Sequence, residues 1–189
     1  MKDIKTLIFD FDGVLFFSER ANAIAYNRAF DDLGLKINDI ALTAPRGRRV
    51  DQLIQDLVPD FPKEDYQKLK DRKFFHYQKL VNENIPNWEL INFLRNMSHT
   101  KNICLATSAS SSNVNFLLQH FDLEKFFDFM VFGHDVKKSK PDPECFVKCM
   151  QQMKCAPEQC LIFEDSELGL KAAENSGAPF IKIVPPELI

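Results

Sequence analysis

The stretch from Leu7 to Gly13 constrains the fold most, because an apolar run of strand length ends there in two carboxylates one residue apart. This pattern predicts a buried strand with a sharp exit at Gly13. Side chains alternate along a strand, so Asp10 and Asp12 are expected to point to the same side. In open α/β sheets, ligands bind outside the carboxyl ends of the strands, and a divalent cation such as Mg²⁺ would offset two neighbouring carboxylate charges there. The alternative is a strand that ends in a solvated acidic turn.

The chain between this strand and residue 85 contains helix patterns with no strand between them. Apolar residues recur at helical spacing in three windows, which are residues 19–30, 48–57 and 62–81. Ser18 precedes the first window and is a typical helix N-cap. We therefore predict a small all-α cap inserted after the first strand, covering residues 17–84.

Beyond residue 85, short apolar strands alternate with helices. The expected strands are residues 103–106, 129–132, 161–163 and 180–184. Strands that alternate with helices favour right-handed crossovers and a parallel sheet. The predicted fold class is α/β, a Rossmann-like, doubly wound parallel sheet of five strands, with residues 1–16 and 85–189 as its core.

The composition is that of a globular protein, with 45% hydrophobic and 27% charged residues among 189. The net charge of −3 gives no electrostatic footprint for nucleic acid or an anionic membrane, so neither partner is expected. The amino terminus has no long apolar segment before the first strand, which favours a cytoplasmic location. The odd number of cysteines, five, favours reduced thiols. We expect a monomer.

Polar residues follow each of the predicted strands that precede the last one. Asp10 and Asp12 follow the first strand, and the later strand ends carry Thr107 and Ser108, then Lys140, then Glu164 and Asp165. Taken singly, these are a strand-end hydroxyl, a solvated lysine and an acidic helix cap. Together at one sheet edge, they supply what a phosphoryl group needs: oxygen ligands for a metal, a cation, a hydroxyl and a carboxylate nucleophile.

These motifs, in this order, make the chain resemble a haloacid dehalogenase superfamily hydrolase with a helical cap. The resemblance covers nearly the whole chain, and the form Glu164-Asp165-Ser166 is similar to the β-phosphoglucomutase and phosphatase-like subfamily. The matching segments are residues 10–15, 105–107, 140–143 and 163–166, the last with Gly169, Ala172, Ala173 and Gly177.

The resemblance implies a role for each motif residue. Asp10 would be the nucleophile and Asp12 the general acid and base. Mg²⁺ would be held by Asp10, the backbone carbonyl of Asp12 and Asp165, with Glu164 in or next to the metal shell. The phosphoryl group would be bound by Thr107, with Ser108 beside it, and Lys140.

Four cap residues are candidates for substrate recognition. Gly47, Arg48 and Arg49 resemble the family's substrate-specificity loop, although two arginines are also common on a solvated surface. Lys73 lies on the apolar stripe of its helix, so it either snorkels out of the core or points at the site. Phe17 departs from the family, in which Asp usually precedes the Ser or Thr of this segment, and this apolar bulk indicates a less polar substrate entrance.

The expected function is a Mg²⁺-dependent phosphatase that hydrolyses a small phosphorylated metabolite, with sugar phosphates as the expected class, through an aspartyl-phosphate on Asp10. A mutase of the β-phosphoglucomutase type is the alternative, because the same residues serve both reactions. A catalytically silent binding module of the same fold is a further alternative. Haloalkanoate dehalogenation is disfavoured, because Asp12 is a phosphoryl-transfer feature that dehalogenases of this fold lack.

Overall fold

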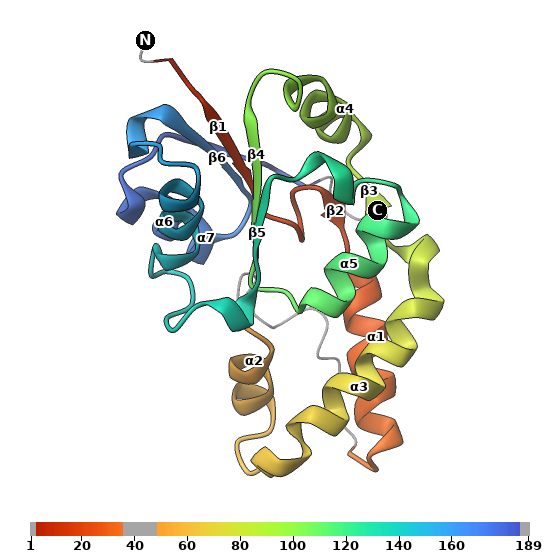
Figure 1. The fold of residues 1–189 in the computed structure, drawn as a ribbon. Helices are drawn as coiled ribbons and strands as arrows, with labels where there is room; N and C mark the ends of the chain where they lie inside the picture. Colours follow the sequence, from red (N-terminus) through yellow and green to blue (C-terminus); the bar gives the residue numbers. More distant parts are fainter. Residues whose placement is uncertain (1–2, 36–48, 186–189) are drawn as a thin grey trace.

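A five-stranded parallel sheet forms the centre of the computed structural model, which describes residues 3–35 and 49–185 (Figure 1). The strand order is β5-β4-β1-β6-β7, so the first strand lies in the middle of the sheet. This confirms the predicted doubly wound α/β class. The bounds are β1 Thr6–Phe9, β4 Asn102–Ala106, β5 Phe129–Val131, β6 Cys160–Glu164 and β7 Phe180–Lys182.

Strand β1 is buried along its whole length because β4 and β6 flank it and helices cover both its faces. Its residues are apolar apart from Thr6, as expected for a strand that contacts protein on every side. Phe9 stacks on Phe163 of β6, with ring centroids 4.6 Å apart. The parallel register aligns Phe9 with Leu105 and Phe163, so the residues that follow these strands meet at one edge of the sheet.

Two helix layers cover the sheet, as Figure 1 shows. Alternate strand residues face each layer: Phe9 packs in the cluster with α4 and α5, and Ile8 in the cluster with α6 and α7. The bounds are α4 Trp88–Met97, α5 Ser111–His120, α6 Glu144–Gln152 and α7 Glu167–Ser176. Short 3₁₀ turns connect them at η4 Glu124–Phe126, η5 Gly133–Asp135 and η6 Pro157–Gln159.

The predicted helices after the first strand form a separate lobe below the sheet in Figure 1, here called the helical insertion. Its elements are α1 Glu19–Asp32, α2 Val50–Leu57, η2 Lys63–Asp65, α3 Tyr66–Tyr77 and η3 Gln78–Glu83. It has a hydrophobic cluster of its own, in which Phe30, Ile54 and Leu69 are almost fully buried. A two-stranded antiparallel ribbon, β2 Phe16–Phe17 and β3 Ile85–Pro86, joins it to the sheet.

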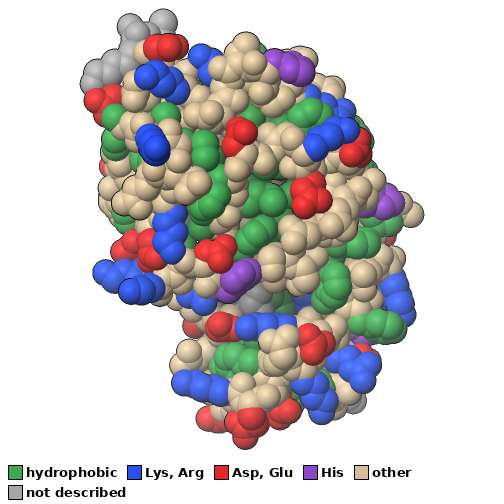
Figure 2. Space-filling view, viewed as in Figure 1, with side chains coloured by type: hydrophobic (Ala, Val, Ile, Leu, Met, Phe, Trp, Pro, Cys, Tyr) green, Lys and Arg blue, Asp and Glu red, His purple; other side chains and the backbone are tan. Residues whose placement is uncertain are grey.

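The surface is mixed in charge. Figure 2 shows basic and acidic side chains interspersed over the visible face, with apolar side chains between them. Among the described residues, no helix is long and apolar enough to cross a membrane. All five cysteines are free thiols.

Candidate active site

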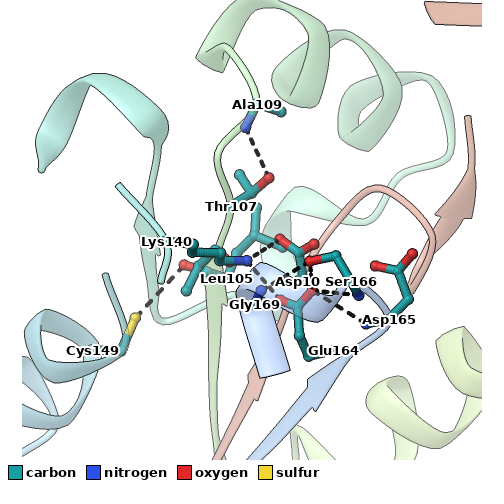
Figure 3. A network of polar contacts seen from close by, with 11 residues as sticks. Asp10, Leu105, Thr107, Ala109, Lys140, Cys149, Glu164, Asp165, Ser166 and Gly169 are labelled. Carbon is teal, nitrogen blue, oxygen red and sulfur yellow. Dashed lines mark hydrogen bonds and ion pairs between the residues drawn. The ribbon is translucent and has the colours of Figure 1, made fainter. Parts of the chain in front are cut away.

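Four predicted site residues meet at the carboxyl edge of the sheet (Figure 3). Asp10 follows β1, Glu164 ends β6 and Asp165 follows it, and Lys140 comes from the loop after η5. The Lys140 ammonium lies 3.0 Å from Asp10 Oδ1 and 2.7 Å from Glu164 Oε2. Lys140, Asp10 and Glu164 are each at most 4% exposed, so these charges interact with little screening from water.

Both carboxylate oxygens of Glu164 are occupied by protein donors. Oε2 accepts a hydrogen bond from Lys140, while Oε1 accepts from the Ser166 hydroxyl at 2.8 Å and from the backbone N–H groups of Asp165 and Ser166. Glu164 therefore fixes the Lys140 ammonium and the start of α7, and both its carboxylate oxygens already accept from protein donors.

Gly169 makes room for Glu164. A Cβ at this position would lie 2.1 Å from Glu164 Cδ, closer than any real contact. The glycine stands inside α7, where it costs helix stability relative to alanine, so packing explains its presence. Gly13 serves Asp165 in the same way, with a φ of +80° and a Cβ position 2.1 Å from Asp165 Oδ2.

The change Gly169→Ala is expected to lower the free energy of unfolding by about 2–4 kcal/mol, because the new methyl group displaces a buried, ion-paired carboxylate. Urea unfolding measures this value. Lys171→Ala, an exposed change on the same helix, is the control and should stay within about 0.5 kcal/mol of the parent. A variant as stable as the parent, or more stable as helix propensity alone predicts, would contradict this packing role.

The acid cluster has the donor set of a hard divalent cation. Asp10, Glu164 and Asp165 each offer a carboxylate oxygen, and these oxygens lie within 4.8 Å of one another. Burial raises the pKa of Asp10 well above its ordinary value and the charge of Glu164 adds to the rise, whereas Lys140 opposes it. One lysine does not balance three carboxylates, so the residues present fit Mg²⁺.

Asp12 is held by the first turns of α1. The Ser18 hydroxyl donates to Asp12 Oδ1, and the Asn22 side-chain amide donates to the same oxygen at 3.3 Å. Ser18 occupies the N-cap position predicted for it, but its side chain makes no capping hydrogen bond. The isolated sequence pattern indicated neither contact, because both depend on how α1 packs against the turn after β1.

Lys73 is buried in the helical insertion, so it does not snorkel to solvent. Its ammonium donates to Asn22 Oδ1 at 2.7 Å and lies 4.3 Å from the ring centroid of Tyr77. Burial lowers its pKa to about 7, against the opposing charge of Asp12. Asn22 therefore connects Lys73 to Asp12, a link that apolar periodicity did not indicate.

The remaining predicted residues occupy different surroundings. Thr107 is buried at the end of β4, where its hydroxyl accepts from Ala109 N–H at 3.1 Å, and Ser108 is half-buried beside it. Arg49 donates to the Val136 carbonyl at 3.2 Å, and so contacts the loop before Lys140. Phe17 pairs with Ile85 in the β2–β3 ribbon. Gly47 and Arg48 lie outside the described residues.

Comparisons with known proteins identify the family of the chain. The model of the haloacid dehalogenase-like hydrolase family matches residues 7–183. The chain belongs to this family. A relative 31% identical over 179 residues, with 92% of this chain and 82% of its own covered, is the phosphorylated carbohydrates phosphatase of Thermotoga maritima. The fructose-1-phosphate phosphatase YqaB of Escherichia coli is 26% identical, covering 94% and 95% of the two chains.

Solved structures of this hydrolase family share the fold. CbbY from Rhodobacter sphaeroides in complex with phosphate superimposes with a TM-score of 0.84 at 22% identity, covering 95% of this chain and 85% of its own. β-Phosphoglucomutase from Clostridium difficile gives a TM-score of 0.76 at 24% identity, covering 95% and 84%. These structures show the fold, and the family model and the curated relatives identify the chain as a haloacid dehalogenase-like hydrolase of the phosphatase and β-phosphoglucomutase type.

Proposed function

We propose that this hydrolase is a Mg²⁺-dependent phosphatase that acts on a small phosphorylated carbohydrate through an aspartyl-phosphate on Asp10. The observation that carries the proposal is the buried cluster in which Lys140 bridges Asp10 and Glu164, with Asp165 beside them. The names of the relatives supply the substrate class, since two of them are phosphatases of phosphorylated sugars.

The residues that would hold Mg²⁺ are Asp10, Asp165 and the backbone carbonyl of Asp12, with Glu164 next to them. When bound, the ion would neutralise charge on the nucleophile and on the phosphoryl oxygens. Lys140 and the Thr107 hydroxyl would bind the remaining phosphoryl oxygens, with Ser108 beside them. Burial of these groups makes their electrostatic contribution larger than it would be in water.

Two chemical steps follow from these positions. A carboxylate oxygen of Asp10 attacks phosphorus as the bond to the sugar oxygen breaks, and Asp12 gives its proton to that oxygen. Asp12 then takes a proton from water, the water oxygen attacks phosphorus, and the bond to Asp10 breaks. Inorganic phosphate leaves, and both carboxyl groups return to their starting states.

Residues 17–84 would act as a cap that closes over this edge of the sheet and excludes water. Lys73 is a cap cation that lies close to the proposed acid and base, since Asn22 joins it to Asp12. A buried ammonium in this place suits the anionic end of the substrate.

The direct test of this proposal is phosphate release from a panel of sugar phosphates and other phosphomonoesters. We expect turnover with Mg²⁺, loss of turnover on chelation and recovery when Mg²⁺ is restored, with sugar phosphates ranking highest. A folded protein that releases no phosphate from any member with Mg²⁺ present would overturn the proposal, as would turnover unaffected by chelation.

A mutase is the second candidate, because relatives and solved neighbours of this chain include β-phosphoglucomutases. Product analysis separates the two reactions. A phosphatase yields the free sugar and inorganic phosphate in equal amounts, whereas a mutase yields an isomeric sugar phosphate and requires a bisphosphate primer.

The buried position of Lys73 predicts a pH dependence. With a pKa of about 7 in the free enzyme, Lys73 loses its positive charge as the pH rises, so kcat/KM for an anionic substrate should decline above about pH 7. Lys73→Arg keeps the charge because guanidinium stays protonated, and should remove this alkaline decline. The pH profiles of kcat/KM between about pH 6 and pH 9.5 measure the effect.

Two further variants complete this test. Lys73→Met should lower kcat/KM at pH 6 and remove the alkaline decline of kcat/KM. Lys68→Arg, an exposed change on α3, is the control and should leave the pH profile of the parent unchanged. A decline that persists with the same midpoint in both Lys73 variants would show that another group causes it.

A further inference from the structure

Helix α2 contacts the loop that carries Lys140. Ser139 Oγ lies 2.8 Å from Gln52 Nε2, which donates to it, and 3.1 Å from Gln52 Oε1, which accepts from it. One turn earlier, Arg49 donates to the Val136 carbonyl at 3.2 Å. We call these contacts, made by Arg49, Gln52, Val136 and Ser139, the α2 clasp.

The loop side of the clasp leads directly to the active site. Ser139 precedes Lys140, the ammonium that bridges Asp10 and Glu164. From the core side, the same loop is held by Glu144, whose carboxylate accepts from the backbone N–H groups of Lys137 and Lys138. The core also holds the loop through Lys148, which donates to the Asp135 carbonyl, and Asn175, which donates to the Pro141 carbonyl. The clasp therefore adds bonds from the helical insertion to a loop that the core holds from its other side.

The helix side of the clasp belongs to the helical insertion. Ile54, two residues after Gln52, is completely buried in the cluster that contains Phe30 and Leu69. This burial packs the Ile54 side chain against α1 and α3, so we expect α2 to move with the insertion. The clasp thus joins the insertion to the Lys140 loop by polar contacts between exposed or half-buried groups, which break and reform more easily than a packed core.

We propose that Gln52 and Ser139 are positioning residues that align Lys140 when the helical insertion is seated over the sheet edge. The proposal rests on the proposed phosphatase function, because Lys140 is the phosphoryl-binding group there. In the seated arrangement, Gln52 fixes the Ser139 side chain and Arg49 fixes the Val136 carbonyl. When the insertion moves away, Lys140 keeps its core partners but its loop loses these bonds. Closure of the helical insertion over the substrate would then align the Lys140 ammonium at the same time.

Turnover kinetics of a double-mutant cycle test the proposal. Gln52→Ala and Ser139→Ala should each lower kcat by about three- to tenfold, the loss of one hydrogen-bonded pair, with KM changed less than about twofold. The double variant should be no slower than the slower single variant, because one pair is removed in all three. Ser139→Thr retains a hydroxyl and should restore most of the activity. Gln55→Ala, an exposed change on the same helix, is the matched control and should match the parent.

Hydrogen exchange measured by mass spectrometry reports on the α2 clasp in the absence of substrate. In Gln52→Ala, peptides covering residues 136–140 should exchange faster than in the parent and in Gln55→Ala. In Ser139→Ala, peptides covering α2 should exchange faster. Unchanged exchange in both segments, or kinetic losses that multiply in the double variant, would overturn the clasp. Absence of phosphatase activity in the parent would instead overturn the proposed function, and hydrogen exchange would still decide the clasp.

Discussion

Replacing Asp10 with asparagine is expected to lower kcat by about 10⁴-fold or more, because the reaction then has no nucleophile to accept the phosphoryl group. The asparagine side chain would have nearly the same shape as the aspartate, and Lys140 would keep its partner Glu164 at 2.7 Å. The fold should therefore survive the change. Phosphate release at saturating substrate and Mg²⁺ measures the effect, and circular dichroism checks the fold.

The matched control for this variant is Asp31→Asn, an exposed aspartate on α1 that loses the same charge far from the acid cluster. It should retain parental turnover. If folded Asp10→Asn protein worked within about tenfold of the parent, another group would have to be the nucleophile, and the proposed mechanism would be wrong.

Replacing Asp12 with asparagine is expected to lower kcat by about 10²–10⁴-fold, the usual contribution of a positioned general acid and base. The loss in kcat/KM, which reports transfer of the phosphoryl group to Asp10, should be larger for sugar phosphates than for an aryl phosphate such as p-nitrophenyl phosphate, because a phenolate leaves without a proton. Mg²⁺ affinity should change little, since Asp12 would contribute its backbone carbonyl. Steady-state kinetics on both substrates and a metal titration measure these effects.

An equal loss in kcat/KM on both substrates would contradict the role of Asp12 as the acid for the leaving group. Weakened Mg²⁺ binding would indicate instead that its side chain holds the metal. Asn22→Ala is a useful companion, because Asn22 contacts both Asp12 and Lys73. If Asn22 positions Asp12, this variant should lose activity in the same substrate-dependent pattern, but to a smaller extent.

The sheet and most of the acid cluster were predictable because they depend on short-range patterns. Buried strands of four or five apolar residues alternate with helices, and parallel strands bring their carboxyl ends to one edge. Asp10, Lys140 and Asp165 therefore meet although they are far apart in the sequence.

The contacts around Asp12 and Glu164 were not predictable in the same way. Ser18 fits an N-cap pattern, yet its hydroxyl donates to Asp12 because α1 starts beside the turn after β1. The family resemblance implies that Glu164 lies in or next to the metal shell, and only the folded turn into α7 reveals that its oxygens already accept from Ser166 and Lys140. Close packing at Gly169 could have been predicted, because a glycine inside a helix usually has a packing or functional reason.

Arg49 illustrates the limit of motif reasoning in the helical insertion. The sequence indicates substrate binding or a solvated surface, and the structure adds a contact with the Val136 carbonyl that neither alternative includes. Substrate binding by Arg49 stays a prediction. The contact with Val136 joins two segments separated by more than eighty residues of sequence, and it depends on how the insertion sits on the sheet. Local patterns carry no information on that arrangement.

The most direct test of the central claim is trapping of the phosphoryl group on the protein. The parent enzyme is mixed with its best sugar phosphate and Mg²⁺, quenched in acid within one turnover, digested and analysed by mass spectrometry. We predict a phosphoryl group on the peptide that contains Asp10, absent without Mg²⁺, absent in Asp10→Asn, and more abundant in Asp12→Asn turning over p-nitrophenyl phosphate. Rapid phosphate release with no phosphoryl group on that peptide, or with the group on another residue, would contradict the account.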